Sequence, residues 1–435
     1  MKIKQTIVAM FCLGILAVSC KKDQTEIAKL SYQTASDSLI TLKIDKELTL
    51  APKISGETNR FQWLENGKEV ANTATYTFKK TEPGLYNIEF NVENSKGKTS
   101  LNYRLRVLGP YGDGVLLLSY TDETGLGNAG LSHMDEDGTI QMNIFSRVNP
   151  GASLSPEANN LYQFNNQYYI SSSTGPNFLT VVDAQTLKLN YVVNQSGASN
   201  VTYFATTDGK TGYVNVTNRR KSGLYPVDLT NKTISSTILE GSKEVTLIPI
   251  NTVNQAIVTG AGKQLIKIEA GKVVVLNTYK ENVSGVVKAS DNSYWLGVQG
   301  SATNKAKFVK LDKSNKGIDS VELAVNFKVP ANGVLTSGGK DEYLYWQETS
   351  RGVICRFNTM TKKAEEFVNH ADAGIIFATC WKVNPKNGEL YIADSPEIFS
   401  GGEPFSNLYI YDKTGKLKKE VKKAGYQITD MIFPQ

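Results

Sequence analysis

The sequence is poor in the residues that most often hold metals or act as nucleophiles. Its 435 residues include only two histidines and four cysteines. His133 and His370 are isolated, so a histidine-rich metal site is excluded and a Ser-His-Asp triad would depend on one chance residue. The sequence has no Cys-x-x-Cys-His haem motif, and the run VTGAGKQL lacks the spacing of a phosphate-binding loop. No metal, no cofactor and no catalytic residue is therefore predicted.

Excess charge and long apolar runs are also scarce. The formal net charge is only +6 and is spread along the chain, which gives no reason to expect nucleic acid as a partner. One apolar run, residues 7–18, stands out, and it is short for a membrane-spanning helix. It follows Lys2 and Lys4 and ends in small residues before Cys20. This pattern predicts an export signal over residues 1–19.

Cysteine usage leaves two thiols in the body of the chain. Cys12 belongs to the export signal and Cys20 directly follows it, whereas Cys355 and Cys380 lie in the apolar runs GVICRF and FATCWKV. An oxidising compartment would allow these two to form a disulfide. Their apolar surroundings favour two buried free thiols instead.

What the sequence does contain is the pattern of β structure. Thirty-six glycines, many tyrosines and no long helical periodicity favour strands and turns throughout. In residues 31–108, the run FQWLENGKEV places Trp63 before the hairpin dipeptide Asn66-Gly67, and TEPGLYNIEFNVENSKGK supplies an alternating partner strand. A Trp that faces such a strand fills the core of an Ig-like sandwich, so Trp63 is predicted to be a core residue. The Gly- and Pro-rich run LGPYGDG, residues 108–114, marks the end of this domain.

The remainder, residues 111–435, is repetitive. Seven similar strand-like runs recur at intervals of roughly 37 to 51 residues, which is the period of a β-propeller. Their equivalent positions are Leu117, Tyr168, Tyr213, Ile257, Tyr294, Tyr345 and Tyr391.

The first of these units lacks an innermost strand. The six later units have one, predicted at 159–164, 201–206, 244–249, 283–288, 331–336 and 375–382. The chain ends on AGYQITDMIFPQ, in which residues 426–433 alternate as a strand that nothing after it could pair with. We therefore predict a seven-bladed propeller of about four strands per blade, closed by the C-terminal strand in the blade that begins near Val115.

Several acidic residues follow the third strands of these units. Asp183, Asp228, Asp312 and Asp412 are predicted to be turn residues rather than catalytic acids. The run MDEDGT, residues 134–139, is faintly similar to a calcium loop, but Asp-x-Asp-Gly is also a plain hairpin turn. Because the rest of an EF-hand ligand set is absent, a turn is predicted here too.

Ligand binding is predicted on the face formed by the loops between second and third strands. The longest of these loops is DSPEIFSGGEPFSN, residues 394–407, and long loops on a rigid scaffold commonly carry binding sites. Their side chains suit a polar ligand with an apolar part. The candidate residues are Arg219, Arg220, Lys305, Arg351, Glu397, Phe399 and Phe405.

Three motifs resemble those of known families. LAVSC, residues 16–20, resembles a bacterial lipobox, which implies that Cys20 is the lipidated N-terminus and that residues 20–30 form a tether. Lys21-Lys22-Asp23 resembles the lysine-then-acid tag of surface-exported lipoproteins of the Bacteroidota type. The run from Trp63 through NGKEV to GLYNIEFNVEN resembles the polycystic-kidney-disease (PKD-like) domain, whose members usually act as spacers or contact modules.

Together with GPYGDGVLLLSY and QYYISSSTGPNFLTVVDAQTLKL, these motifs resemble surface lipoproteins in which a PKD-like module precedes a YncE-like propeller. The resemblance implies an outer-membrane protein, lipid-anchored and facing the cell exterior. It further implies a non-catalytic role in capturing a corrinoid, peptide or glycan ligand for a TonB-dependent transporter.

Two other classes stay open at this point. One is a propeller enzyme, a lyase or hydrolase, acting through loop carboxylates. The candidates for that role are Asp122, Glu123, Asp394 and Glu397. The other is a structural or adhesion protein of the cell surface, which would need no concave pocket.

Overall fold

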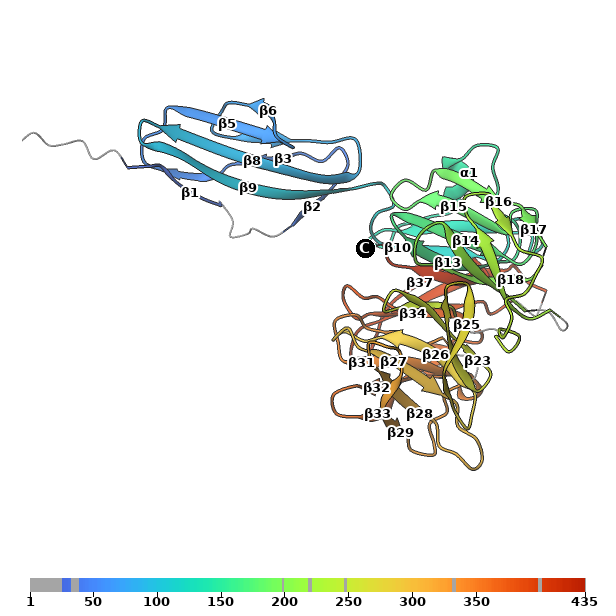
Figure 1. Ribbon diagram of the computed structural model, residues 1–435. Coiled ribbons are helices and arrows are strands. Elements are labelled where there is room, and N and C mark those ends of the chain that lie inside the picture. The colour runs from blue at the N-terminus through green and yellow to red at the C-terminus, as the bar shows by residue number, and fades with distance from the viewer. Residues whose placement is uncertain are drawn as a thin grey trace, which may run out of the picture. The chain divides into compact units, whose positions relative to one another are not determined.

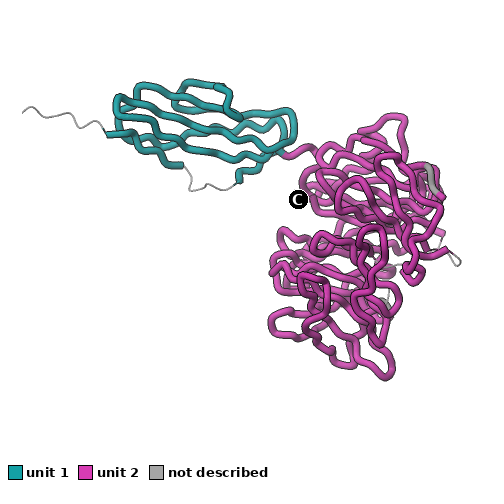
Figure 2. The backbone as a smooth tube through the Cα atoms, in the orientation of Figure 1, with its two compact units in different colours: residues 1–107 teal, residues 108–435 magenta. Residues whose placement is uncertain are grey.

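The computed structural model describes residues 26–32, 39–197, 199–217, 221–245, 249–330, 334–397 and 401–434. The chain forms two compact units, residues 1–107 and residues 108–435 (Figure 2). Strands make up nearly all of the regular structure in both (Figure 1). In the described part, the helical elements are α1 (Ile144–Val148), η1 (Thr349–Arg351) and η2 (His370–Ala373). The predicted all-β class is confirmed.

The first unit is an Ig-like β-sandwich. A five-stranded antiparallel sheet, in the order β2-β9-β8-β5-β6, packs against the two-stranded sheets β1-β4 and β3-β7. The strands are β1 (Lys29–Ser31), β2 (Ile40–Lys43), β3 (Leu48–Leu50), β4 (Lys53–Ser55), β5 (Arg60–Glu65), β6 (Lys68–Ala71), β7 (Tyr76–Phe78), β8 (Gly84–Asn94) and β9 (Gly97–Leu108).

Trp63 is at the centre of this sandwich. Its side chain is fully buried, with its ring 4.3 Å from that of Phe90 and 5.6 Å from that of Tyr76. The indole N–H donates to the carbonyl of Thr73 at 2.8 Å, which satisfies the polar atom of a buried Trp. The prediction that Trp63 is a core residue is confirmed.

The sandwich begins earlier in the chain than predicted. Lys29 and Leu30 belong to β1, and Ala28 is only 3% exposed, so the tether predicted over residues 20–30 is too long at its C-terminal end. The side chain of Asn94 donates to the carbonyl of Glu26 at 2.8 Å, which ties this segment to the sheet. Cys20 and the predicted signal lie outside the described residues.

The second unit is a β-propeller. Its described residues form seven sheets, the blades, with four strands each, and β17 (Gln195–Ser196) adds a fifth strand to one of them. The four strands follow the order of the chain in every blade except the one in which β38 pairs with β10. The innermost strands contact one another around the ring in the order β38, β13, β18, β22, β26, β30, β34 and back to β38. The seven-bladed propeller is therefore confirmed.

The blades are numbered here from the one that contains β10. Blade 1 comprises β38 (Ile428–Ile432), β10 (Val115–Ser119), β11 (Gly130–Met134) and β12 (Ile140–Gln141). Blade 2 comprises β13 (Ala158–Phe164), β14 (Gln167–Ser172), β15 (Leu179–Asp183) and β16 (Leu189–Val193). Blade 3 comprises β18 (Val201–Thr206), β19 (Thr211–Val216), β20 (Gly223–Asp228) and β21 (Thr233–Ile234).

The remaining blades follow the same order. Blade 4 comprises β22 (Asn251–Val253), β23 (Ala256–Ala261), β24 (Gln264–Glu269) and β25 (Lys272–Thr278). Blade 5 comprises β26 (Val283–Lys288), β27 (Tyr294–Val298), β28 (Lys307–Leu311) and β29 (Gly317–Glu322). Blade 6 comprises β30 (Thr336–Ser337), β31 (Tyr343–Glu348), β32 (Val353–Asn358) and β33 (Lys363–Asn369). Blade 7 comprises β34 (Ala378–Val383), β35 (Leu390–Asp394), β36 (Phe405–Tyr411) and β37 (Leu417–Tyr426).

The C-terminal strand closes the ring as predicted. β38 pairs antiparallel with β10, and Leu117 lies opposite Met431. The strand begins at Ile428 rather than at residue 426, because Tyr426 still belongs to β37 and Gln427 turns the chain with a φ of 48°. A side chain at Gly425 would come within 2.9 Å of Ile428, so glycine allows this close turn at the seam.

Two innermost strands differ from their predicted ranges. β30 covers only Thr336–Ser337, against a prediction of 331–336, of which 331–333 lie outside the described part. β22 begins at Asn251, whereas the alternation of the sequence predicts a strand at 244–249, of which 246–248 lie outside the described part. Asn254 and Gln255 form a tight turn, with φ values of 47° and 63°. This turn pairs Val253 of β22 with Ala256 of β23. The turn therefore decides where this strand lies.

The acidic residues after the third strands are turn residues, as predicted. Each carboxylate accepts hydrogen bonds from backbone N–H groups of the turn that follows it. These bonds favour the ionised form and lower the pKa of Asp228, Asp312 and Asp412. Their carboxylates hold the turns between the outer two strands of their blades.

Candidate functional site

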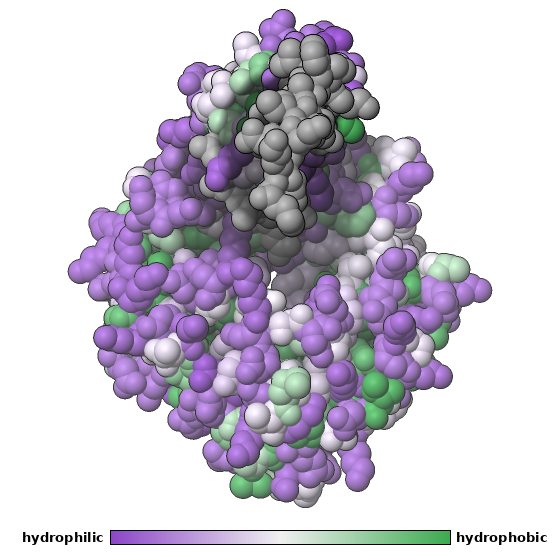
Figure 3. Space-filling view, turned by 90° about the vertical axis from the view of Figure 1, so that its left-hand side faces the viewer, coloured by the Kyte–Doolittle hydropathy of each residue, from purple (hydrophilic) through white to green (hydrophobic). Residues whose placement is uncertain are grey.

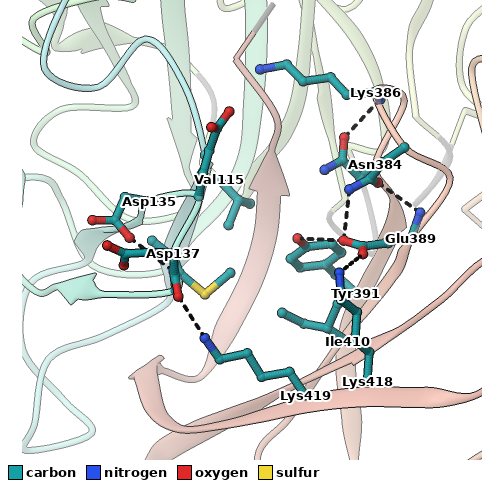
Figure 4. A pocket seen from close by; sticks show the side chains of 15 residues that line it. Val115, Asp135, Asp137, Asn384, Lys386, Glu389, Tyr391, Ile410, Lys418 and Lys419 are labelled. Atoms are coloured by element: carbon teal, nitrogen blue, oxygen red, sulfur yellow. Dashed lines mark hydrogen bonds and ion pairs between the residues drawn. The ribbon is translucent and has the colours of Figure 1, made fainter. Parts of the chain in front are cut away.

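A cleft between blade 1 and blade 7 is the candidate site of the propeller (Figure 4). It has a volume of about 380 Å³, within the ordinary range for sites that bind small molecules. The turn between β11 and β12 forms one wall, and β37 with the turn between β34 and β35 forms the other. The lining residues are Gly114, Val115, Met134, Asp135, Glu136, Asp137, Gly138, Asn384, Lys386, Asn387, Glu389, Tyr391, Ile410, Lys418 and Lys419.

The blade 1 wall is acidic and is held by its own turn. Asp135 accepts the backbone N–H groups of Gly138 at 3.1 Å and Thr139 at 2.8 Å, which confirms that MDEDGT is a hairpin turn. The Thr139 hydroxyl donates to Asp137 at 2.7 Å, and this bond lowers the pKa of that carboxyl. Asp137 is therefore ionised at neutral pH.

The blade 7 wall is basic and partly paired. Lys418 forms an ion pair with Glu389, which raises the pKa of Lys418. Glu389 also accepts a hydrogen bond from the side chain of Asn387 at 2.8 Å. Burial, with a smaller contribution from Glu389, raises the pKa of Tyr391 to about 12, so its hydroxyl stays protonated.

Only one hydrogen bond crosses the cleft between the two walls. The ammonium of Lys419 donates to the backbone carbonyl of Asp137 at 3.1 Å. Lys386 and Glu136 are exposed, and neither side chain forms an ion pair or a side-chain hydrogen bond with another described residue. In Figure 4 the ammonium of Lys386 lies apart from the other labelled side chains. Two opposite charges at this cleft are thus available to a ligand.

The floor of the cleft is apolar. Val115, Met134 and Ile410 line it and are nearly buried, because they also pack in the core shared by blades 1 and 7. A floor of this kind holds the shape of the cleft, since its residues cannot move without disturbing the seam of the ring.

The ring seam between blades 7 and 1 contains a half-buried ion pair. Lys382 of β34 lies 2.5 Å from Asp430 of β38, and Asp430 also accepts the backbone N–H of Leu161 at 2.8 Å and the amide of Asn160 at 3.1 Å. Desolvation alone would lower the pKa of Lys382, but the neighbouring carboxylate outweighs it and the pKa is raised. Asp430 therefore ties the innermost strands of blades 7, 1 and 2 together.

The residues predicted from the sequence to bind ligand lie elsewhere. They belong to loops between second and third strands, whereas the cleft is formed at the opposite ends of the strands, by a first-to-second and a third-to-fourth turn. Arg219, Arg220 and Phe399 lie outside the described residues.

The described members of that set have structural partners. Arg351 forms ion pairs with Glu348, at 2.8 Å, and with Glu366, so both faces of its guanidinium fork are used within blade 6. Lys305 lies 3.8 Å from Glu322, in an exposed pair. These contacts explain both residues without a ligand.

Phe405 and Glu397 are also accounted for within blade 7. The ring of Phe405 stacks on that of Tyr426 at 4.8 Å, and the ammonium of Lys423 lies 4.3 Å from its centre. Glu397 is exposed and lies against Gly402, where an added side chain would meet its carboxylate at 2.6 Å. The structure does not bring Lys305 or Arg351 into contact with these two residues.

Two of the carboxylates considered for catalysis organise loops. Asp122 accepts the backbone N–H groups of Thr124 and Gly127 and the Thr124 hydroxyl. Asp394 is 1% exposed and accepts the N–H groups of Ile376 and Phe377, while burial raises its pKa. Neither carboxylate is directed at a described cavity.

The remaining reactive side chains are buried apart from one another. Cys355 and Cys380 are free and buried, as predicted. Within the described residues, no three or more His, Cys, Asp or Glu side chains are grouped so that they could hold a metal ion.

None of the helices that the structure describes has the length and hydropathy needed to span a bilayer. The side of the molecule in Figure 3 is mainly hydrophilic, with apolar residues in small separate groups.

The fold and the site define the class of this protein. An Ig-like domain is followed by a β-propeller, and the propeller has a cleft between two of its blades. The profile described as "Domain of unknown function (DUF5074)" matches residues 121–434, so the chain belongs to this family. The profile described as "PKD-like domain" matches residues 29–94, and the first unit is a domain of this type. No curated protein matches the chain.

Solved structures share the fold. A quinoprotein alcohol dehydrogenase-like protein from Bacteroides thetaiotaomicron VPI-5482 is 18% identical with a TM-score of 0.57, over 93% of this chain and 99% of that chain. A protein from Lactobacillus plantarum is 10% identical with a TM-score of 0.51, over 74% of this chain and 99% of that chain. At these identities the likeness shows the fold alone.

Proposed function

We propose that this protein is a non-catalytic, lipid-anchored capture protein of the outer membrane that binds a small polar ligand in the cleft between blades 1 and 7. The observation that carries the proposal is the pair of uncompensated charges, Lys386 and Glu136, beside a cavity with an apolar floor. Polar groups placed around an apolar pocket are the usual composition of a small-molecule site.

The position of the cleft favours binding without large movement. Both walls belong to blades that meet where β38 of blade 1 contacts β34 of blade 7, and the pair Lys382–Asp430 lies at the same seam. A site built on a rigid scaffold does not lose affinity by ordering loops when the ligand arrives.

The chemistry of the lining favours binding over catalysis. Lysines, carboxylates and amides line the cleft, without a serine, cysteine or histidine among the described lining residues. The carboxylate most enclosed there, Glu389, is already held by Lys418 and Asn387. These contacts hold Glu389 in place and leave it poorly suited to act as a general acid or base.

The cellular setting follows from the N-terminal motifs. Lipidation of Cys20 would attach the chain to the outer membrane with the propeller facing the exterior, and the PKD-like domain would act as a spacer. A TonB-dependent transporter would be the partner that takes over the ligand, which by resemblance is a corrinoid, a peptide or a glycan. A Cys20→Ala variant should be released from the membrane fraction, and retention in that fraction would contradict the anchor.

The decisive experiment combines purification and calorimetry. The full-length protein is purified from solubilised outer membranes, and the chain from residue 21 onward is titrated with a cobamide, a peptide mixture and a glycan mixture. We expect a transporter to co-purify and one ligand class to bind, with weaker binding in Lys386→Gln and unchanged binding in Lys422→Gln, an exposed lysine outside the cleft. If no transporter co-purifies and none of the ligands binds, the capture function is wrong.

A further inference from the structure

We infer that the cleft selects a small zwitterion, an amino acid or a dipeptide with free termini, which it orients by charge. The inference rests on the proposed capture function and narrows its ligand. Its basis is the distribution of charge over the two walls, which come from opposite ends of the propeller chain.

The two walls carry opposite charge. The blade 1 wall contributes three carboxylates, Asp135, Glu136 and Asp137, and no base. The blade 7 wall contributes three lysines, 386, 418 and 419, against a single acid, Glu389. Because Lys418 and Glu389 neutralise each other, the blade 7 wall remains basic.

These opposite charges face the same cavity without pairing. No lysine nitrogen of blade 7 lies within 4.0 Å of a carboxylate oxygen of the blade 1 wall, and the hydrogen bond that joins the walls uses the backbone carbonyl of Asp137. A cation would be repelled by one wall and an anion by the other. A molecule with both charges would satisfy both walls, with its ammonium group toward blade 1 and its carboxylate toward blade 7.

The size and floor of the cleft restrict the ligand further. A volume of about 380 Å³ accommodates one or two amino-acid residues, whereas a corrinoid is several times larger. An uncharged glycan would leave Lys386 and Glu136 without partners. The apolar floor at Val115, Met134 and Ile410 suits an aliphatic side chain.

The test is a calorimetric titration with Ala-Leu and two derivatives that each lack one charge. N-acetyl-Ala-Leu lacks the ammonium, and Ala-Leu-amide lacks the carboxylate. We expect Ala-Leu to bind and each derivative to bind about tenfold more weakly, because each loses one charge-assisted contact. Raising the salt concentration should weaken Ala-Leu binding as well, since the cleft is open to solvent.

Two variants assign each end of the dipeptide to its wall. Lys386→Gln should weaken the binding of Ala-Leu about tenfold and leave the binding of Ala-Leu-amide nearly unchanged. Glu136→Gln should also weaken the binding of Ala-Leu about tenfold, and it should leave the binding of N-acetyl-Ala-Leu nearly unchanged. Both side chains are exposed and unpaired among the described residues, so neither change should affect folding. Lys422→Gln and Glu420→Gln, on β37 but outside the lining, are the matched controls.

The outcomes separate this inference from the function on which it rests. Equal binding of Ala-Leu and its blocked derivatives, or variants whose effects are the same for all three, would overturn the zwitterion. Binding of a glycan or a cobamide but not Ala-Leu, weakened by Lys386→Gln, would overturn the inference and leave capture in the cleft standing. If nothing binds, both are wrong.

Discussion

The two units of this protein close their folds over very different distances along the chain. In the PKD-like domain, β8 and β9 are joined by a tight turn between Asn94 and Gly97, and the core gathers around Trp63. In the propeller, the seam joins Ser119 to Tyr426, which are 307 positions apart. The first unit therefore closes over much shorter separations than the second, which remains incomplete until its last strand is in place.

The core of the PKD-like domain and the seam of the propeller also differ in the kinds of contact that hold them. The PKD-like core is built of aromatic and aliphatic side chains. The propeller seam adds polar contacts: the backbone N–H of Ile428 donates to the hydroxyl oxygen of Ser406 at 2.9 Å, and Lys382 forms an ion pair with Asp430. Hydrogen bonds require defined geometry, so the polar seam specifies the register of the closing strand as well as holding it.

Deletion of residues 425–435 should have the largest effect and should sharpen the comparison. It removes β38 and leaves the edge of β10 unpaired, so the propeller should unfold or aggregate while the PKD-like domain keeps its own transition. Differential scanning calorimetry would show the loss of one of two transitions. Deletion of residues 434–435 alone, which follow β38, is the control. If the protein that lacks residues 425–435 still shows both transitions, closure of the ring by this strand is contradicted.

Trp63→Ala should affect only the first unit. It removes a fully buried side chain with three aromatic neighbours and should cost about 3 to 5 kcal/mol, a large part of the stability of a domain of this size. Differential scanning calorimetry should show the PKD-like transition at a lower temperature and an unchanged propeller transition. Val70→Ala, at a position 40% exposed, should change neither. A shift of the propeller transition would show that the units do not unfold independently.

Lys382→Met tests the polar seam. It leaves the carboxylate of Asp430, which is 8% exposed, without its charged partner. The propeller should be destabilised by about 2 to 3 kcal/mol. Breaking a fully buried pair would cost more, but Lys382 is 28% exposed. The double variant with Asp430→Leu should recover part of this loss. Lys386→Met, on the turn that follows β34, should have no effect on stability. If Lys382→Met and wild type melt at the same temperature, the ion pair does not stabilise the seam.

Asp412→Ala should give the smallest effect, a lowering of the propeller midpoint by a few degrees. The Thr414 hydroxyl and backbone N–H groups of the turn hold the pKa of Asp412 below its ordinary value of 3.8. A carboxyl with a lowered folded pKa stabilises the fold above its unfolded pKa, and this contribution disappears as the pH falls through the folded value. The difference between wild type and variant should therefore be constant near neutral pH and shrink below about pH 4.

The matched control for this turn is Asp319→Ala, an exposed position within β29. Melting curves of wild type and both variants are recorded between pH 3 and pH 7, and at neutral pH Asp319→Ala should lower the midpoint less than Asp412→Ala does. A difference between wild type and Asp412→Ala that grew in acid would contradict the role of this carboxylate.

Much of the fold could be predicted because its signals are local or periodic. The alternation of the C-terminal run, the missing innermost strand near Val115 and the Asp residues after third strands each appear within a few positions of the sequence. The start of β22 was predicted wrongly because the alternation in 244–249 was a weaker signal than the turn at Asn254. Turn geometry determined the register there.

The candidate site could not be predicted in the same way. Lys419 and Asp137 meet across the cleft although 282 positions separate them, and the sequence shows one as a charged strand residue and the other as part of a turn. Arg351 was selected as a ligand-binding residue because its loop is exposed, but Glu348 and Glu366 already occupy it. The acidic run 134–139 was predicted only as a turn, and neither it nor the lysines that face it were among the candidate ligand-binding residues.

The sequence alone determined the elements of this protein: a Trp-centred sandwich, seven repeated units and a final strand that must pair with the first unit. These follow from alternation, period and turn chemistry, which act between neighbours in the chain. The tertiary structure decided where opposite charges face each other. That depends on ring closure, because only closure brings blade 7 against blade 1 and forms a cleft from residues that lie far apart in the sequence.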